Sequence, residues 1–355
     1  MRFFAFVAFL AALIATVTAP AEARQRTYYV AADEITWNYL PLGHNALSAR
    51  KPTSILGKYL GLSYRKAVYH EYTDASFTSQ KTTPSDAYRG LLGPTIRAEV
   101  GDTVDVVFKN NTHIPLSIHV HGLFYKKNSE GAPYNDGAAN GRAMDSGVPP
   151  RKTYTYHYEV PERSGPGPND PTSILWMYHS HTDEVGDVNT GLIGPIVVTR
   201  RGMAREDGSP NDVNREVFAG FLEMEEDQSA FLPVNIKAFK KVKQPKVRPP
   251  DYLASMQFFT VNGFLYGNMP PIVMRQGERV RWYVMAGMSD FDFHTPHWHG
   301  NTVITSGMRA DLVQLSPMGM LVADMTPDDP GTWLFHCHVN LHLDEGMEAV
   351  YQVLP

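Results

Sequence analysis

The feature of this sequence that most restricts its fold is an internal duplication. The segment GPTIRAEVGDTVDVVFKNNTHIPLSIHVHG (93–122) is similar in order and spacing to NMPPIVMRQGERVRWYVMAGMSDFDFHTPHWHG (268–300). Likewise, LWMYHSHTDEVGDVNTGLIGPIVV (175–198) is similar to TWLFHCHVNLHLDEGMEAVYQVL (332–354). One pattern that occurs twice in this way predicts two domains of the same kind.

Hydrophobic residues in both copies alternate with period two. The segments TVDVVFKN (103–110) and ERVRWYVM (278–285) have the pattern of strands with one apolar face. Turns rich in Gly, Pro and Asn separate such strands, and no long segment has a helical period. We therefore predict an all-β chain of two β-sandwich domains. The predicted domains are 24–199 and 215–355, joined by a polar linker at 200–214.

The N-terminal residues resemble an export signal. Arg2 precedes an apolar stretch that ends near Val17, and the small-residue pattern AEA follows and ends at Ala23. The apolar stretch is short for a helix that spans a bilayer. We predict a signal peptide at 1–23 and a secreted or periplasmic mature chain.

Charge gives little indication of a macromolecular partner. The formal net charge of −5 at pH 7 is mild and favours neither a nucleic acid nor an anionic membrane. The basic run KAFKKVKQPKVRPP (237–250) could dock a partner, but a solvated surface loop stiffened by proline is the simpler interpretation.

Ten of the fourteen histidines fall into four clusters. In a strand, residues i and i+2 point to the same face, so each His-x-His pair presents two imidazoles to a common ion. Four such pairs in matching places of a duplicated domain predict a metal centre. The clusters are His119 and His121; His179 and His181; His294, His297 and His299; and His336, His338 and His342. We expect structural or solvated roles for the other four, which are His44, His70, His113 and His157.

The only cysteine, Cys337, lies between two of these histidines and must point to the other face of the strand. A lone cysteine in an exported chain is either a free thiol or a ligand. Thiolate, imidazole and a weak thioether are the ligands of a blue copper centre, and such a centre here would be only a few covalent bonds from a histidine pair. The candidate ligands are Cys337, His342, Met347 and, as the natural fourth, His294.

The motifs HVHG, HSH, HTPHWH and HCHVNLHLDEGM resemble the four copper-binding motifs of the multicopper oxidases, and more narrowly those of the two-domain small laccases. The resemblance covers essentially the whole mature chain. It implies tandem cupredoxin-like Greek-key β-sandwich domains, four coppers, and reduction of dioxygen to water. By motif, it implies a type 1 copper held by His294, Cys337, His342 and Met347. It implies a type 2 copper held by His119 and His297. It also implies two type 3 coppers, one held by His121, His179 and His338, and the other by His181, His299 and His336.

The first copy of the pattern lacks the blue-copper ligands. At the matching positions it has Leu116, Ser180, Val185 and Thr190. This difference argues against a copper nitrite reductase, which has its blue copper in the first domain and lacks a full set of trinuclear ligands.

Reduction of dioxygen consumes protons, so we expect a carboxylate relay near the trinuclear centre. Members of the family often have an acid between HCH and the next histidine, but positions 339–341 carry none. Glu130 is our candidate and Asp136 the alternative, while an ordinary acidic turn fits equally well. Tyr125 matches a tyrosine that small laccases place beside the trinuclear centre as a reserve electron donor, and a packing role is equally plausible.

The substrate is less well determined by the motifs. The resemblance favours a laccase-like oxidase of phenols or aromatic amines, but YHEYTDASFT and YHSHTDEVGDVNTGLIGP also resemble the ceruloplasmin branch. A metallo-oxidase acting on Cu⁺ or Fe²⁺ is therefore the alternative. Ferroxidases of that branch hold iron at places where this chain has Phe259, Ala254 and Leu341, and hydrocarbon cannot bind Fe²⁺. Asp290 and Asp292 are the nearby acids and fit an ordinary surface loop, so we expect phenol oxidation to exceed Fe²⁺ oxidation.

Two further interpretations are weaker. Four methionines could bind Cu⁺, although packing in the core or in loops explains them better; they are Met308, Met318, Met320 and Met325. A copper electron carrier without oxidase activity would need only the blue site, and would leave the eight histidines of the four pairs without a purpose.

The histidine pairs also predict an assembly. Two pairs come from each domain, so the trinuclear centre must lie between two domains. The linker 200–214 is short for a direct fold-back, and head-to-tail contacts between copies close into rings. Small laccases, which this chain resembles, close at three subunits. We therefore expect a homotrimer with a trinuclear centre at each interface, which would take dioxygen and a small aromatic reductant or metal ion.

Overall fold

The computed structural model describes residues 23–135, 144–238, 249–289 and 292–355. Nearly all of the predicted signal peptide, most of the basic run, Asp136 and Asp290 lie outside these residues. What we predict for them stays a prediction.

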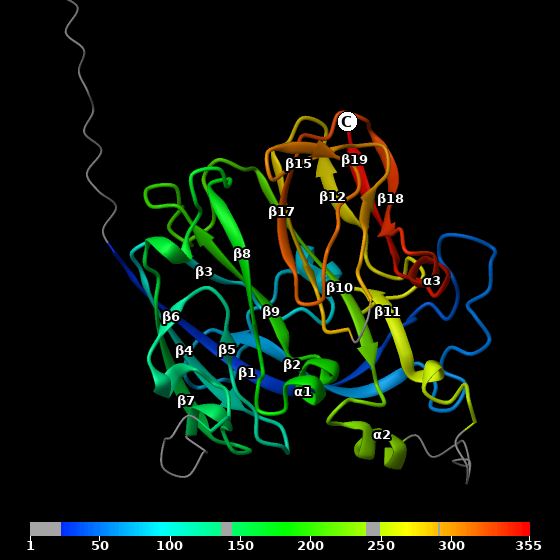
Figure 1. Ribbon diagram of the computed structural model, residues 1–355, viewed down its shortest axis with the longest axis horizontal. Helices are drawn as coiled ribbons and strands as arrows, with labels where there is room; N and C mark the ends of the chain where they lie inside the picture. The colour runs from blue at the N-terminus through cyan, green and yellow to red at the C-terminus, as the bar shows by residue number, and fades with distance from the viewer. Residues whose placement is uncertain (1–22, 136–143, 239–248, 290–291) are drawn as a thin grey trace, which may run out of the picture.

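The first nine strands form two sheets that pack face to face, mostly in the left half of Figure 1. One sheet has the order β2-β1-β4-β7-β6 and the other β3-β9-β8-β5. The strands are β1 (Gln25–Asn38), β2 (Ser63–Tyr72), β3 (Ile96–Glu99), β4 (Thr103–Asn110), β5 (His119–Val120), β6 (Phe124–Tyr125), β7 (Thr153–Glu159), β8 (Ser173–His179) and β9 (Ile193–Thr199).

The last ten strands repeat this arrangement. Their sheets have the orders β11-β10-β13-β17-β15-β16 and β12-β19-β18-β14, and segment 200–214 joins β9 to β10. The strands are β10 (Arg215–Glu225), β11 (Gln257–Val261), β12 (Ile272–Arg275), β13 (Val280–Ala286), β14 (Pro296–Trp298), β15 (Val303–Thr305), β16 (Met308–Ala310), β17 (Met320–Met325), β18 (Gly331–Cys337) and β19 (Glu348–Leu354).

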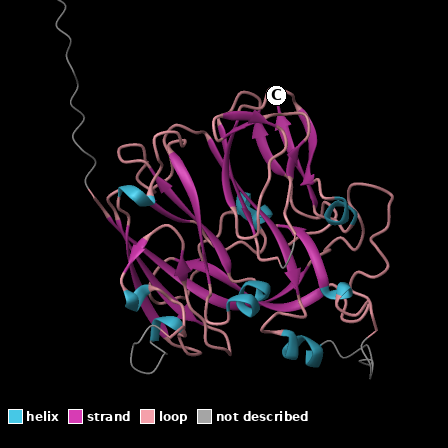
Figure 2. Cartoon of the chain, in the orientation of Figure 1, coloured by secondary structure: helices cyan, strands magenta, loops and turns pink. Residues whose placement is uncertain are grey.

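The helices are short and sit at the ends of strands, as Figure 2 shows. The α-helices are α1 (Glu184–Thr190), α2 (Leu232–Ala238) and α3 (Asn340–Asp344), and the 3₁₀ turns are η1 (Pro84–Arg89), η2 (Lys127–Ser129), η3 (Met144–Ser146), η4 (Glu162–Ser164) and η5 (Ala254–Met256). None of the described helices has the length and apolar character needed to cross a membrane. The predicted all-β class is confirmed, since strands build both halves.

Alternation predicts burial correctly in one copy of the pattern and only partly in the other. In β4, Val104, Val106 and Phe108 are buried while the residues between them are not. In β13, all seven residues are buried. The second face of β13 packs against the first domain, where the hydroxyls of Tyr283 and Ser173 hydrogen-bond at 2.7 Å. The two sandwiches therefore share a core between them.

A buried arginine reinforces this contact between the sandwiches. Arg281 forms an ion pair with Asp324 at 2.7 Å and donates to Thr172 (2.7 Å) and Ser173 (2.8 Å) of the first domain. A buried cation with complete partners is costly to separate from them. The relative position of the two domains is thus set by a packed interface rather than by the linker alone.

Candidate metal centres

The predicted blue-copper ligands come together in one buried cluster. Cys337 ends β18, His342 lies in α3, and His294 precedes β14. The sulfur of Cys337 lies 3.4 Å from Nδ1 of His342 and 4.0 Å from Nδ1 of His294. All three side chains are fully buried, and their ligand atoms lie within 4.8 Å of one another. This is a donor set for a thiophilic transition-metal ion.

The surroundings of Cys337 favour the thiolate. Burial raises the pKa of a thiol, but here contacts with His294 and His342 and the backbone N–H of Thr295 outweigh burial and lower the pKa of Cys337 to about 6. The Thr295 N–H donates to the sulfur at 3.3 Å. Since the thiolate is the metal-binding form, the site is prepared to bind a cation at neutral pH.

Met347 belongs to the same cluster through the chain that follows α3. Its N–H donates to the carbonyl of His342 at 2.8 Å, and its carbonyl accepts the N–H of Cys337 at 3.1 Å. The Met347 side chain is fully buried in the same hydrophobic cluster as Cys337. This position is compatible with the weak thioether ligand that the sequence predicts.

Replacing Met347 with leucine is expected to raise the reduction potential of the blue centre, because a weak thioether donor would stabilise the more positive ion. We expect a rise on the order of 60 mV, which corresponds to a tenfold change in preference for a one-electron couple. Redox titration of the blue absorption measures it. Met274→Leu, in the same buried cluster, is the matched control, and a potential that shifts equally in both variants would remove Met347 from the ligand set.

The outward edge of His342 carries a carboxylate. Its Nδ1 faces the Cys337 sulfur, and its Nε2 lies 3.2 Å from Oδ2 of Asp292, whose side chain is 42% exposed. Phe259 stacks on the His342 ring at 4.3 Å but is itself buried. From the sequence alone, Asp292 fits an ordinary loop, and apolar groups are expected beside His342. That expectation was incomplete, because the loop before β14 folds back onto α3 and brings the Asp292 carboxylate to His342.

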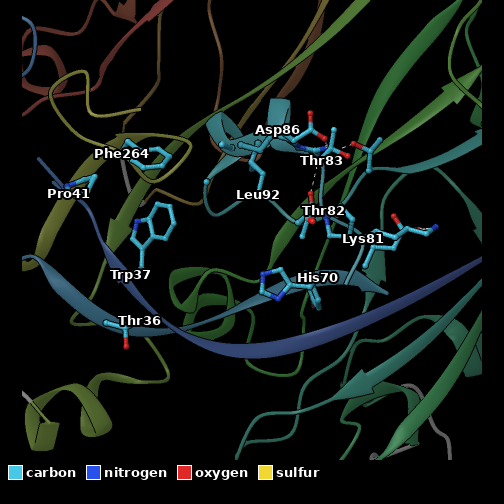
Figure 3. Close-up of a pocket in the computed structure, with 18 of the residues that line it drawn as sticks. Thr36, Trp37, Pro41, His70, Lys81, Thr82, Thr83, Asp86, Leu92 and Phe264 are labelled. Atoms are coloured by element: carbon cyan, nitrogen blue, oxygen red, sulfur yellow. Dashed lines mark hydrogen bonds and ion pairs between the residues drawn. The ribbon is translucent and has the colours of Figure 1, made fainter. Parts of the chain in front are cut away.

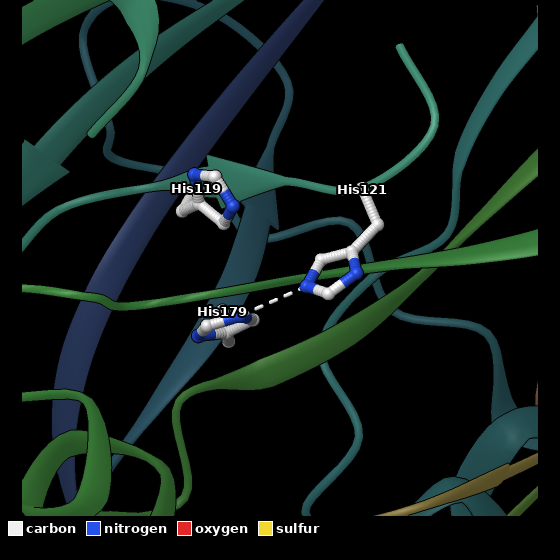
Figure 4. Close-up of side chains that lie close together, drawn as sticks. All are labelled: His119, His121 and His179. Carbon is white, nitrogen blue, oxygen red and sulfur yellow. Dashed lines mark hydrogen bonds between the residues drawn. The ribbon is translucent and has the colours of Figure 1, made fainter. Parts of the chain in front are cut away.

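The four histidines of the first domain gather where β5 meets β8; we call His119, His121, His179 and His181 the domain 1 half-site. Figure 4 shows three of these rings facing one another, with Nε2 of His121 and Nε2 of His179 3.1 Å apart. His181 lies 5.2 Å from His119, measured between ring centroids. Antiparallel pairing of His119 with His179 brings the two His-x-His motifs together.

The second domain holds a matching set; we call His297, His299, His336 and His338 the domain 2 half-site. Nε2 of His336 lies 3.2 Å from Nδ1 of His297 and 3.0 Å from Nε2 of His299. The His338 ring is 5.4 Å from that of His297. Pairing of β14 with β18 sets this register, with His297 opposite His336.

Backbone carbonyls orient the imidazoles of both half-sites. Nδ1 of His179 bonds to the carbonyl of Ser180 at 3.0 Å, and Nδ1 of His336 to that of Cys337 at 2.7 Å. Nδ1 of His119 bonds to the carbonyl of Glu130 at 2.7 Å. In each ring the other nitrogen is then free to face a metal ion, an arrangement found behind most histidine ligands.

Three of these imidazoles, those of His121, His179 and His336, are neutral at physiological pH. Burial, reinforced by the neighbouring histidines, lowers the pKa of His121 and of His336 to about 4. Burial also lowers the pKa of His179 to about 3. Only a neutral imidazole has the lone pair that binds a metal ion, so both half-sites are prepared to bind cations.

The two half-sites do not meet within one chain. In the described residues, ring contacts and hydrogen bonds connect histidines inside each half-site, and none connects one half-site to the other. Figure 1 shows α1, which follows His181, at the lower centre and α3, which follows His338, at the right. Each half-site therefore holds only part of the predicted trinuclear ligand set.

Two predicted auxiliary residues differ in how they reach the domain 1 half-site. The Tyr125 ring lies 6.0 Å from that of His119, and burial raises its pKa. Glu130 contacts His119 through its backbone carbonyl, while its carboxylate pairs with Lys127 and accepts the hydroxyl of Tyr134 at 2.9 Å. The relay role of Glu130 remains a prediction.

An acid that the sequence analysis missed lies against the same half-site. Glu184 begins α1, and its carboxylate oxygens lie 3.2 Å from Nε2 of His181 and 3.7 Å from Nε2 of His179. Its spacing of three residues after the HSH motif was the available signal. In the second domain the position that corresponds to Glu184 is occupied by Leu341. A comparison of the two copies therefore gave no sign that an acid belongs at this position.

The place of the blue site in the first domain is filled by a polar network. Ser180, the counterpart of Cys337, donates to buried Asp187 at 2.6 Å and accepts the N–H of Ser117. Burial raises the pKa of Asp187 to about 6. This arrangement is consistent with the inference that this domain lacks a type 1 site, because Ser180 offers a hydroxyl where the second domain has the Cys337 thiolate, and Val185 stands where it has His342.

Comparisons with known proteins identify the family of this chain. Residues 70–202 and residues 240–355 each match a family described as multicopper oxidase. The chain belongs to the multicopper oxidase family. The family implies copper, and the converging imidazoles and the buried thiolate fit that metal.

The curated relatives of this multicopper oxidase belong to large proteins. The chain is 38% identical over 356 residues to Ferroxidase HEPHL1 of Homo sapiens, 37% identical over 351 residues to Hephaestin of Mus musculus and 37% identical over 340 residues to Ceruloplasmin of Ovis aries. The alignments cover 97%, 93% and 92% of this chain, but 30%, 29% and 32% of those relatives. The chain thus spans about a third of their length, and the predicted ceruloplasmin-like features are confirmed.

Solved structures support the fold. The structure described as Multicopper Oxidase mgLAC has a TM-score of 0.60 and 20% identity, covering 93% of this chain and 86% of that one. Blue Copper Oxidase from Nitrosomonas europaea has a TM-score of 0.56 and 17% identity, covering 94% and 86%. At these identities the likeness concerns the fold alone.

Proposed function

We propose that this multicopper oxidase oxidises Fe²⁺ and reduces dioxygen to water. From the sequence alone, this metallo-oxidase role is the alternative to a laccase-like oxidase. The observation that carries the proposal is the Asp292 carboxylate, 3.2 Å from Nε2 of His342. An exposed carboxylate oxygen is a hard ligand for a divalent cation, and it stands at the edge of the blue-copper ligand set. The names of the curated relatives, Ferroxidase HEPHL1 among them, support the same choice.

Copper bound at these sites would supply a one-electron acceptor at the blue centre and a multinuclear site for dioxygen. We propose four ions: one type 1, one type 2 and two type 3. The type 1 ligands are His294, Cys337, His342 and Met347; the type 2 ligands are His119 and His297; the type 3 ligands are His121, His179 and His338 on one ion and His181, His299 and His336 on the other. Four Fe²⁺ are oxidised for each dioxygen, which takes up four protons to form two waters.

In this proposal Asp292 holds the substrate ion next to His342. Its carboxylate offsets the positive charge of Fe²⁺ at a partly exposed position, and its contact with Nε2 links the substrate to the buried ligand. Because Asp292 is 42% exposed, hydrated ions can reach it from solvent. The buried Phe259 ring, stacked on His342, excludes water from the other side of that imidazole.

Oxidation of Cu⁺ is less well supported than oxidation of Fe²⁺. A Cu⁺ substrate site needs converging soft ligands such as thioethers. Met325 is buried in the core, whereas Met308 is 69% exposed on β16. Core packing accounts for Met325 and a surface position for Met308.

Oxidation of an aromatic reductant is the second candidate. Phe293 and Leu341 are 60% and 53% exposed, and they neighbour Asp292 and His342 in the chain. An apolar rim of this kind would contact an aromatic ring. Specificity constants for Fe²⁺, Cu⁺ and a panel of phenols on fully copper-loaded protein decide between the candidates, and a phenol used more efficiently than Fe²⁺ would overturn our choice.

Replacing Asp292 with asparagine is expected to lower kcat/KM for Fe²⁺ by about tenfold or more, the effect of losing one charged contact. Turnover of a neutral phenol should change far less, because a phenol carries no positive charge for Asp292 to bind. Asp344→Asn is the matched control, since Asp344 is an exposed acid of α3 paired with Arg50. The blue absorption should persist in both variants. An equal loss for Fe²⁺ and phenol would show that Asp292 acts only through the geometry of His342.

We also propose that the protein is a homotrimer in which the domain 1 half-site of one chain meets the domain 2 half-site of the next. The separation of the two half-sites within a chain supports this. Exposed apolar side chains lie close to both half-sites in the chain: Phe124 and Val185 in domain 1, and Leu312, bridged to His297, in domain 2. Interfaces between subunits bury such groups, and head-to-tail contacts close into rings.

A further inference from the structure

A pocket of about 750 Å³ lies outside both half-sites and the blue centre. It opens where the end of β1 and the loop after η1 meet the turn at Phe264 in the second domain. Figure 3 shows Trp37, Pro41 and Phe264 on one side, His70 below, and Lys81, Thr82 and Thr83 opposite. Its size suits a small organic molecule.

One wall of the pocket is aromatic and fixed in place. The rings of Trp37 and Phe264 meet edge to face, with centroids 4.9 Å apart. The indole N–H of Trp37 donates to the carbonyl of Gly263 at 2.7 Å. This bond holds the indole against the second domain, so a ring that entered the pocket would find an ordered apolar surface.

The largely buried guanidinium of Arg89 also lines the pocket. The Arg89 side chain is only 13% exposed and donates through Nη2 to the carbonyl of Gly93 (2.9 Å) and to Oγ1 of Thr95 (2.8 Å). Within the described part of the chain, its buried Nε has no hydrogen-bond partner. The nearest carboxylate, that of Asp86, is 4.0 Å away. The positive charge of Arg89 is therefore incompletely neutralised.

The other cationic groups around the pocket have close carboxylate partners. Lys81 pairs with Glu71 at 2.5 Å and Arg97 with Glu216 at 2.7 Å. Burial lowers the pKa of Arg89, which shows that its surroundings disfavour the charge. An anion placed beside Arg89 would relieve that cost, and a carboxylate matches the planar donors of a guanidinium.

We propose that this pocket binds a small aromatic carboxylate, with its ring against Trp37 and Phe264 and its carboxylate on Arg89. The ligand is not a reductant in this role, so the site is independent of the proposed Fe²⁺ oxidation. Because the aromatic wall contains a residue of each domain, the bound molecule would also stabilise the contact between the sandwiches.

Isothermal titration calorimetry of the copper-loaded full chain with naphthalene-2-carboxylate tests the proposal. We expect saturable binding at one site per chain, and binding of the neutral analogue 2-naphthalenemethanol that is about tenfold weaker or more, because it lacks the charged contact. The carboxylate should also raise the thermal midpoint. Absence of saturable binding, or equal affinity for both probes, would overturn the proposal.

Two matched pairs of variants locate the site. Trp37→Leu should weaken binding about tenfold, as expected for loss of an aromatic contact, whereas Trp37→Phe should keep most of it. Arg89→Met should remove the preference for the carboxylate, and Arg89→Lys should keep part of it. If Arg89→Met does not fold, the two Trp37 variants and the neutral analogue still test whether the ligand binds in this pocket and whether its charge matters. Undiminished binding in Trp37→Leu would place the ligand elsewhere and refute the assignment.

Discussion

Replacing Cys337 with serine is expected to abolish the blue absorption and the oxidase activity together. The sulfur of Cys337 is the only thiolate that the chain can offer, and a serine hydroxyl is neither soft nor ionised at neutral pH. We expect about one copper in four to be lost, because the half-site histidines lie on the other face of β18. Visible absorption, copper analysis and oxygen consumption measure the three effects.

Ser180→Ala is the matched control for this variant. Ser180 occupies the corresponding place in the first domain, between His179 and His181, and hydrogen-bonds Asp187. Its removal perturbs a His-x-His strand without touching the thiolate, so the blue colour should remain. A blue colour that survives Cys337→Ser, or disappears equally in Ser180→Ala, would contradict the assignment of the thiolate.

The features that could be predicted from the sequence are those set by local periodicity. Alternation placed each His-x-His pair on one face of a strand, and the structure brings His119 to His179 and His297 to His336 by direct strand pairing. The duplication indicated that both domains would do this in the same way. Cys337 points away from its flanking histidines for the same local reason.

Features that depend on how distant segments pack could not be predicted in this way. Asp292 reaches His342 because a loop folds across α3, and nothing in its sequence neighbourhood distinguishes it from a solvated acid. The second face of β13 is buried because another domain covers it, so Tyr283 contacts Ser173 where alternation alone predicts exposure. Arg89 is likewise buried by residues remote in sequence, including Phe218.

The same distinction applies to the assembly. Each half-site follows from local pairing, whereas the way in which two half-sites meet depends on contacts between copies. Within one chain, the Arg281 network and the shared core hold the two sandwiches in a fixed arrangement. Bringing the half-sites of one chain together would require breaking that contact. A neighbouring copy can complete each half-site without this cost.

Mixing two inactive variants is therefore expected to restore activity. One carries His119→Ala and His121→Ala, and the other His297→Ala and His299→Ala. After random subunit exchange at equal amounts, about a quarter of head-to-tail interfaces would pair an intact domain 1 half-site with an intact domain 2 half-site. Oxygen consumption should rise toward about a quarter of the wild-type rate, and light scattering should report a trimer. Each variant alone, incubated identically, is the control.

The recovered fraction of activity distinguishes a site shared between two chains from a site within one chain. If all eight histidines acted within a single chain, every chain in the mixture would lack one histidine pair, and exchange could restore nothing. If the ions bridge subunits, copper removal should also dissociate the trimer, because binding is linked to assembly. A fully active monomer, or no recovery despite exchange proven by differently tagged subunits, would refute the shared-site proposal.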